Sequence, residues 1–322
     1  MRKLLTSLLL PLLALTACSQ DEPAVEAPTE SPSPTERTFP ANSFMAELQK
    51  KGKIVIGVKF DVPQFGSLNP ATQKPEGFDV DLGNRIAEEL GVEAEFLEAI
   101  SANRIPFLQT DKVDLIISTM TINDERKQQI DFSNVYYIAE QRLLVKKDSK
   151  INEVADANNA GTTICSAKGS TSEKNIRAVA PKAKINLQDG YSQCFALLQN
   201  GQVQAVTTDN VILVGLLKND PANFRITGTP FSKEPYGMGI KKGRVGFVDF
   251  VNEVLTDVKK DGTFVKLYDK WVKPLTGETA TPPPDTAAAE APGSTPAATT
   301  SPAAKATTPP AAGNAPAATP TY

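Results

Sequence analysis

The chain contains two stretches of similar pattern, residues 108–119 and 198–209, and each ends at a polar side chain that could contact a ligand. Each stretch reads as the end of a helix, a polar turn and a buried strand. The first ends at Thr119 and the second at Asp209. Because open α/β sheets bind ligands beyond the carboxyl ends of their strands, the repeat predicts two similar lobes with a binding cleft between them.

The segment after the first strand holds the residue types that would bind a carboxylate. Thr119 and Thr121 supply hydroxyl groups, and Arg126 follows within the same short segment. A planar guanidinium beside hydroxyl donors suits a carboxylate, because the contact can be bidentate and charge-assisted. The alternative is that residues 123–127 are only the solvated start of a helix, and the residues alone leave both interpretations open.

The second half of the chain offers an anion site and a carboxylate. Ser170 and Thr171 follow a predicted strand and precede a predicted helix, whose free N–H groups could bind an anion. Asp209 also stands between a strand and a helix, where it could accept hydrogen bonds from a ligand ammonium. For both positions a simple helix cap without a ligand is the alternative.

Strands alternate with helices along the whole globular part. Residues 53–58 form a β-branched run typical of a buried strand, and residues 78–90 show the four-residue spacing of an amphipathic helix ended by Gly91. The same alternation of predicted strands and helices begins again near residue 162, which indicates largely parallel sheets covered by helices. The extended runs 136–146 and 236–241 predict two crossings between the lobes, and hence a hinge of two strands.

The first residues are predicted to direct the chain out of the cytoplasm. Arg2 and Lys3 precede an apolar run that is too short to span a bilayer, and the segment ends in LTAC, which resembles the bacterial lipobox. That resemblance implies a signal peptide at 1–17 and a lipid on Cys18, which would hold the protein at a membrane. An ordinary secretory signal is the alternative.

Both segments that flank the globular part have compositions that cannot bury a core. Residues 18–43 are predicted to be a disordered tether, and residues 276–322, rich in Ala, Pro and Thr, a disordered tail. With Cys18 lipidated, Cys165 and Cys194 are an even pair in an oxidising compartment, which favours a disulfide over two buried thiols.

The composition excludes several functions. The chain has no histidine, which removes the commonest general base and most zinc sites. Its formal net charge is −3 and no basic tract resembles a nucleic-acid footprint. We therefore predict no catalytic residue, no metal, no cofactor and no nucleic-acid partner, and we expect a monomer.

From about residue 44 to 274 the chain resembles the family 3 amino-acid-binding proteins of ABC transporters. The resemblance is carried by TMTINDERKQQIDFS, CSAKGSTSEKNI, AVTTDNVIL and KEPYGMGIKK. It is most similar to glutamate- and aspartate-binding members, through GVKFD, residues 103–106 and the cysteine pair. The resemblance implies an α/β, two-lobed periplasmic-binding-protein (Venus flytrap) fold of type II with a two-strand hinge. Lobe 1 would comprise residues 44–145 and 236–275, and lobe 2 residues 146–235.

The resemblance also implies roles for individual residues. Thr119, Thr121 and Arg126 would hold the α-carboxylate of an amino acid from lobe 1, and Asp209 would bind its α-ammonium. The α-carboxylate would be met from lobe 2 by Thr171 and Ser170.

Two further cations are placed by the resemblance beside the ligand side chain. Arg104 matches the position that reads a distal carboxylate, and Lys59 stands where some members place an acid for cationic ligands. Counting Arg126, Arg104 and Lys59 against Asp209 favours a ligand with two carboxylates. The absence of histidine, which some acidic-amino-acid binders use at the side chain, leaves glutamate, aspartate and glutamine open.

The predicted function is that of a membrane-anchored substrate-binding component of an ABC importer. It would capture glutamate, or aspartate, and deliver it to permease subunits outside the cytoplasm, at the cell surface or in the periplasm. The alternatives are a glutamine-binding member of the same family, or a periplasmic dehydratase acting on prephenate or arogenate on the same scaffold.

Overall fold

The computed structural model describes residues 37–285. The predicted signal peptide, Cys18, the tether up to residue 36 and the tail beyond Asp285 lie outside these residues. Within the described part of the chain, no helix is both long and apolar enough to cross a bilayer.

One sheet, with the helices that cover it, forms what we call lobe 1. Its strand order is β5-β1-β6-β14-β7, in which β1 pairs in parallel with β5 and β6, and β14 runs antiparallel to its neighbours. The strands are β1 (Lys53–Val58), β5 (Glu93–Glu98), β6 (Leu115–Ile116), β7 (Ile130–Phe132) and β14 (Gly239–Lys241). The helices are α1 (Phe44–Lys51), α2 (Phe78–Leu90), α3 (Arg104–Gln109), α4 (Asp124–Lys127), α9 (Val245–Lys260), α10 (Thr263–Trp271) and α11 (Lys273–Thr276).

A second sheet with its own helices forms lobe 2. Its order is β10-β9-β11-β8-β12, with β9 parallel to β10 and β11, and β8 antiparallel to β11 and β12. The strands are β8 (Tyr137–Lys146), β9 (Thr163–Ala167), β10 (Lys184–Gln188), β11 (Ala205–Asp209) and β12 (Phe224–Thr227). The helices are α5 (Val154–Ala157), α6 (Thr171–Val179), α7 (Tyr191–Gln199) and α8 (Asn210–Leu217).

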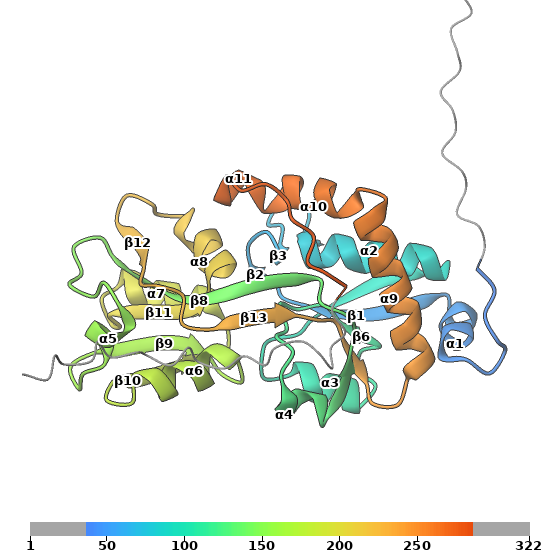
Figure 1. Cartoon of the computed structure of the whole chain (residues 1–322), viewed down its shortest axis with the longest axis horizontal. Coiled ribbons are helices and arrows are strands. Elements are labelled where there is room, and N and C mark those ends of the chain that lie inside the picture. Colours follow the sequence, from blue (N-terminus) through green and yellow to red (C-terminus); the bar gives the residue numbers. More distant parts are fainter. Residues whose placement is uncertain (1–36, 286–322) are drawn as a thin grey trace, which may run out of the picture. The chain divides into compact units, whose positions relative to one another are not determined.

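Two antiparallel strands connect the sheets. The first half of β8 pairs with β13 (Lys233–Tyr236), from Tyr137 opposite Tyr236 to Glu140 opposite Lys233, and its second half pairs with β11 and β12. Figure 1 shows β8 and β13 running side by side between the two groups of elements. This arrangement confirms the predicted two-lobed α/β fold with a two-strand hinge; the predicted lobe boundaries stay predictions.

The sequence patterns correspond to local structure where the pattern is strong. The α2 helix buries Phe78, Leu82, Ile86 and Leu90 along one face and ends at Gly91, which adopts the left-handed conformation expected of a C-terminal glycine. The repeat is also found: α3 ends at Gln109 before β6, and α7 ends at Gln199 before β11.

A three-stranded sheet was not predicted from the sequence. It consists of β2 (Asp61–Val62), β3 (Gly66–Leu68) and β4 (Pro75–Glu76), strands too short to show an alternating pattern. The predicted tail also begins within the described residues: beyond α11 the chain continues to Asp285, whose carboxylate lies 2.8 Å from Lys259 Nζ.

A disulfide joins Cys165 in β9 to Cys194 in α7, as the sequence predicted. Both residues are fully buried, and the bond fastens a helix of lobe 2 to its sheet. The pair is separated by 29 positions, so the closed loop is long enough to restrict the unfolded chain substantially.

We expect replacement of both cysteines by alanine to lower the free energy of unfolding by about 3–4 kcal/mol, on the chain-entropy model for a loop of this length. Urea unfolding of the oxidised wild type and the double variant measures the difference. An unchanged unfolding midpoint would contradict the expectation.

Candidate functional site

Every side chain predicted to bind a ligand is buried where the two lobes meet, with exposures between 1% and 9%. From lobe 1 the set contains Lys59, Arg104, Thr119, Thr121 and Arg126, and from lobe 2 Ser170, Thr171 and Asp209. Buried charges and hydroxyls need partners in the protein or in a ligand, so the contacts of each group decide what it can still bind.

The residues that were predicted to bind a carboxylate from the two lobes are in contact. The hydroxyl oxygens of Thr121 and Thr171 lie 3.3 Å apart. Arg126 donates from Nη1 to the carbonyl of Thr121 at 2.7 Å, and from Nη2 to the carbonyl of Gly169, across the lobes, at 3.3 Å. Thr171 opens α6, so Arg126 and the free N–H groups of a helix start meet here.

Ser170 already makes hydrogen bonds within lobe 2, and the cationic form of Arg126 is destabilised by its surroundings. Ser170 caps α6, since its Oγ accepts from Glu173 N at 3.0 Å and donates to Ala167 O at 2.7 Å. Burial, and after it the charge of Arg104, lower the pKa of Arg126 to about 9. An anion placed between Arg126 and α6 would favour the charged guanidinium and so oppose this lowering of its pKa.

Asp209 has one carboxylate oxygen without a partner. Its Oδ2 accepts a hydrogen bond from the hydroxyl of Tyr236 at 2.5 Å, whereas no group of residues 37–285 donates to its Oδ1. Although Asp209 precedes α8, its side chain does not cap that helix. Burial, and then the charge of Glu234, raise the pKa of Asp209 to about 8. A ligand ammonium would supply the missing donor and favour the ionised form.

The two cations assigned to the ligand side chain already bind groups of lobe 1. Arg104 donates from Nη1 to the carbonyls of Ser118 (2.9 Å) and Thr119 (3.2 Å), and from Nε to that of Ser101 (3.3 Å). Lys59 donates from Nζ to Ser101 Oγ at 2.8 Å. Burial lowers the pKa of Lys59 to about 8, so this lysine is a weaker cation than an exposed one.

The sequence interpretation missed two buried carboxylates. Asp79, in the first turn of α2, accepts from Thr119 N and from the hydroxyl of Tyr136, each at 2.9 Å, and burial raises its pKa to about 7. This contact, with Arg104, holds Thr119 in a left-handed conformation with a φ of 43°. The backbone N–H of Thr119 is therefore occupied, and only its hydroxyl remains for a ligand.

The second missed carboxylate, Glu234, belongs to β13 and is fully buried. Its Oε2 accepts from the hydroxyls of Thr121 (2.6 Å) and Thr171 (2.8 Å). Glu234 lies inside KEPYGMGIKK, so the motif contained a signal for it, whereas an acid in the first turn of a helix, such as Asp79, usually indicates a solvated position. With both included, three buried acids face the three buried cations of the site.

The margins of the cleft also carry contacts between the lobes. Asp61 Oδ2 accepts from the backbone N–H of Tyr191 at 2.7 Å, which places a carboxylate of lobe 1 at the start of α7. Lys174 and Glu125 form an exposed ion pair at 2.7 Å. The lobes are therefore closed on each other in this structure.

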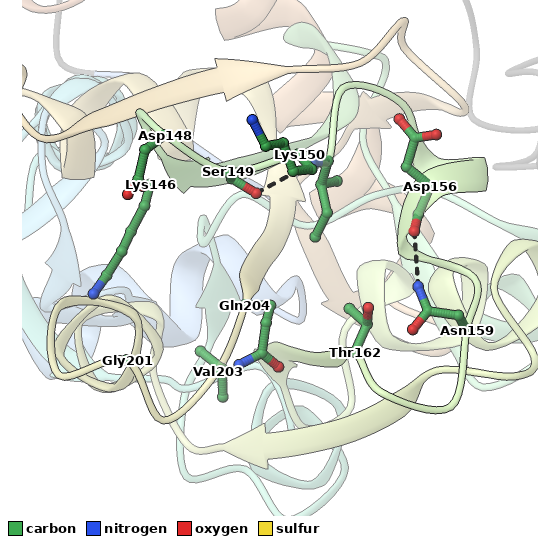
Figure 2. A pocket seen from close by; sticks show the side chains of 11 residues that line it. Lys146, Asp148, Ser149, Lys150, Asp156, Asn159, Thr162, Gly201, Val203 and Gln204 are labelled. Carbon is green, nitrogen blue, oxygen red and sulfur yellow. Dashed lines mark hydrogen bonds between the residues drawn. The ribbon is translucent and has the colours of Figure 1, made fainter.

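A surface pocket of about 440 Å³ lies elsewhere in lobe 2 and shares no residue with this site. Figure 2 shows it between Lys146 and Asp148 on one side and Thr162 and Gln204 on the other, with a local hydrogen bond from Asn159 to Asp156 O. Within residues 37–285, no cluster of three or more His, Cys, Asp or Glu could hold a metal ion.

Comparisons with known proteins agree with this architecture. A family model described as bacterial extracellular solute-binding proteins, family 3, matches residues 54–274. The ABC transporter glutamine-binding protein GlnH of Bacillus subtilis is 41% identical, over 85% of this chain and 98% of that protein. The glutamine-binding protein of Geobacillus stearothermophilus is 45% identical, over 73% and 89%. The glutamate-binding protein GluB of Corynebacterium glutamicum is 34% identical, over 70% and 80%.

The family model covers more than half of the chain, and the motifs that carried the resemblance lie in the residues that form the buried site. The chain belongs to the family 3 bacterial extracellular solute-binding proteins.

Proposed function

We propose that this protein is the substrate-binding component of an amino-acid ABC importer and that its ligand is glutamine. Glutamine thereby replaces glutamate, which the sequence favoured. The two relatives named for glutamine are 41% and 45% identical to this chain, whereas the relative named for glutamate is 34% identical. The observation that carries the proposal is the charge balance of the buried site.

That balance differs from the one counted on the sequence. Asp79, Asp209 and Glu234 stand among Lys59, Arg104 and Arg126, so acidic and basic groups are equal in number. Their charges cancel when all three acids are ionised, a state that a ligand ammonium beside Asp209 favours. A glutamine zwitterion adds no net charge to the closed cleft, whereas glutamate adds a carboxylate that must lose its water. Burying a charge without a full partner costs several kcal/mol. A site of this composition therefore favours a neutral amino acid.

The main-chain groups of the ligand find complementary partners in the site. Arg126, the N–H groups at the start of α6 and the hydroxyl of Thr119 face the α-carboxylate in this assignment. The free Oδ1 of Asp209 accepts from the α-ammonium, which satisfies an otherwise unpaired buried oxygen. Lys59 and Arg104 then serve as donors to the oxygen of the side-chain amide.

The relatives, two of them named as glutamine-binding proteins and one of these as part of an ABC transporter, support transport rather than catalysis. A ligand that contacts both lobes favours the closed form, and this form presents a continuous surface to permease subunits. We further propose that the monomer acts outside the cytoplasm and is held at the membrane by lipid on Cys18.

Calorimetry with the standard amino acids tests the ligand. We expect glutamine to bind with a dissociation constant of about 1 μM or tighter, and glutamate at least about tenfold more weakly. Arg126→Ala should lose binding because it removes the main partner of the α-carboxylate. Arg177→Ala, at an exposed position of α6, is the matched control and should bind as the wild type does. If glutamate binds more tightly than glutamine, the assignment of the ligand is wrong. If the protein converts prephenate, the proposed transport role is wrong.

Binding should also release protons near neutral pH. In the closed cleft without a ligand, burial and the charge of Glu234 raise the pKa of Asp209 to about 8, so near neutral pH a proton competes with a ligand ammonium for this carboxylate. An ammonium ligand requires the ionised form, so affinity should rise as the pH increases from 6 to 8. Calorimetry in buffers of different ionisation enthalpy measures the number of protons released on binding. Asp209→Asn should abolish the release that comes from Asp209. Binding at pH 6.5 without proton release would contradict this role for Asp209.

A further inference from the structure

We propose that Glu234 is a positioning residue: a carboxylate on the hinge that joins the ligand-site hydroxyls of the two lobes and thereby sets the affinity of the closed state. The proposal rests on the proposed function in one respect, that an amino acid binds between the lobes.

The position of Glu234 allows it to contact both lobes. It lies on β13, opposite Ala139 of β8, so both hinge strands meet at this residue. A single oxygen, Oε2, accepts from Thr121 of lobe 1 at 2.6 Å and from Thr171 of lobe 2 at 2.8 Å. Because a carboxylate oxygen has two lone pairs, Oε2 can accept both hydrogen bonds. Both bonds form only when the lobes are closed.

The other oxygen of Glu234 is held as firmly. Oε1 accepts from Asn175 Nδ2 at 2.9 Å and from Ser232 Oγ at 2.5 Å. Asn175 Nδ2 also donates to Gln141 Oε1 at 3.0 Å, and Gln141 belongs to β8. The carboxylate thus receives four donors, which match its capacity, and it is tied to α6 and to both hinge strands.

These contacts change what the two threonines can offer a ligand. A threonine hydroxyl has one hydrogen to donate, and Thr121 and Thr171 give theirs to Glu234. Their hydroxyls therefore present only lone pairs to the cleft, contrary to the donor role implied by the sequence resemblance. The α-carboxylate is left to Arg126, to the hydroxyl of Thr119 and to the N–H groups at the start of α6. Glu234 thus orients the O–H bonds of Thr121 and Thr171 toward itself and away from a ligand.

The contacts also make ligand affinity depend on the hinge. Thr121 and Thr171 belong to different lobes, so an opening motion breaks at least one of the two bonds to Oε2. Loss of hydrogen bonds to a charged acceptor typically changes an equilibrium by about 10- to 100-fold. A variant without the carboxylate should therefore close less readily and release its ligand faster.

Glu234→Gln is the direct test, because an amide has one acceptor oxygen in place of two. We expect the dissociation constant for glutamine to rise about 10- to 100-fold, with faster dissociation in stopped flow. Thr171→Val keeps the shape and the backbone N–H but removes the hydroxyl, and it should weaken binding by a similar factor. The double variant should be little weaker than Glu234→Gln alone, since Thr171→Val removes a contact that the Glu234 change has already weakened.

Glu140→Gln is the matched control, because Glu140 lies on the other hinge strand and its side chain makes no hydrogen bond within the described residues. It should bind as the wild type does. Small-angle scattering adds a readout of closure: Glu234→Gln should be more open than the wild type at the same glutamine concentration. A role in folding alone would instead lower the melting temperature and leave affinity and closure unchanged.

The outcomes separate this proposal from the proposed function. If the wild type prefers another amino acid, the ligand assignment fails, and the same variants are compared with that amino acid. If Glu234→Gln matches the wild type in both affinity and lobe closure, or if its effect adds fully to that of Thr171→Val, the positioning role is wrong.

Discussion

The closed arrangement depends on the neutralisation of charges that are removed from water between the lobes. Lys59, Arg104 and Arg126 are all nearly inaccessible, and charges in such surroundings are stable only with close partners. Arg104 and Lys59 bind carbonyl and hydroxyl oxygens of their own lobe, whereas Asp209 keeps an unpaired oxygen. Under the proposed function, an amino acid would supply an ammonium to Asp209 and a carboxylate to Arg126, so ligand binding would favour the closed form.

The hinge takes part in this chemistry as well as connecting the lobes. Two side chains of β13, Glu234 and Tyr236, contact site residues directly, and Gln141 of β8 is linked to Glu234 through Asn175. Tyr236 binds the carboxylate proposed to hold the ammonium, and Glu234 binds the threonines beside Arg126. Because the hinge strands run between the lobes, these side chains lie within reach of both halves of the site.

The sequence predicted the features that have a local pattern. The apolar spacing of α2, the two helix ends at Gln109 and Gln199, and the alternation of strands and helices all follow from short-range periodicity. It also indicated the residues of the site through motifs. It could not predict the short strands β2 to β4, or the burial of Asp79, because burial of an acid depends on segments distant in sequence. Asp79 contacts Thr119 and Tyr136, and neither contact has a signature around residue 79.

This limit explains why the acidic ligand was favoured first. The sequence count set Arg126, Arg104 and Lys59 against Asp209 alone, because the resemblance assigned ligand contacts to those residues only. Two more carboxylates become part of the site through tertiary contacts, and they cancel the excess positive charge. Charges interact over several ångströms in a poorly screened interior, so an acid that does not touch the ligand still alters which ligand is favoured. The proposal of a neutral amino acid therefore rests on Asp79 and Glu234 as much as on the groups that would contact the ligand.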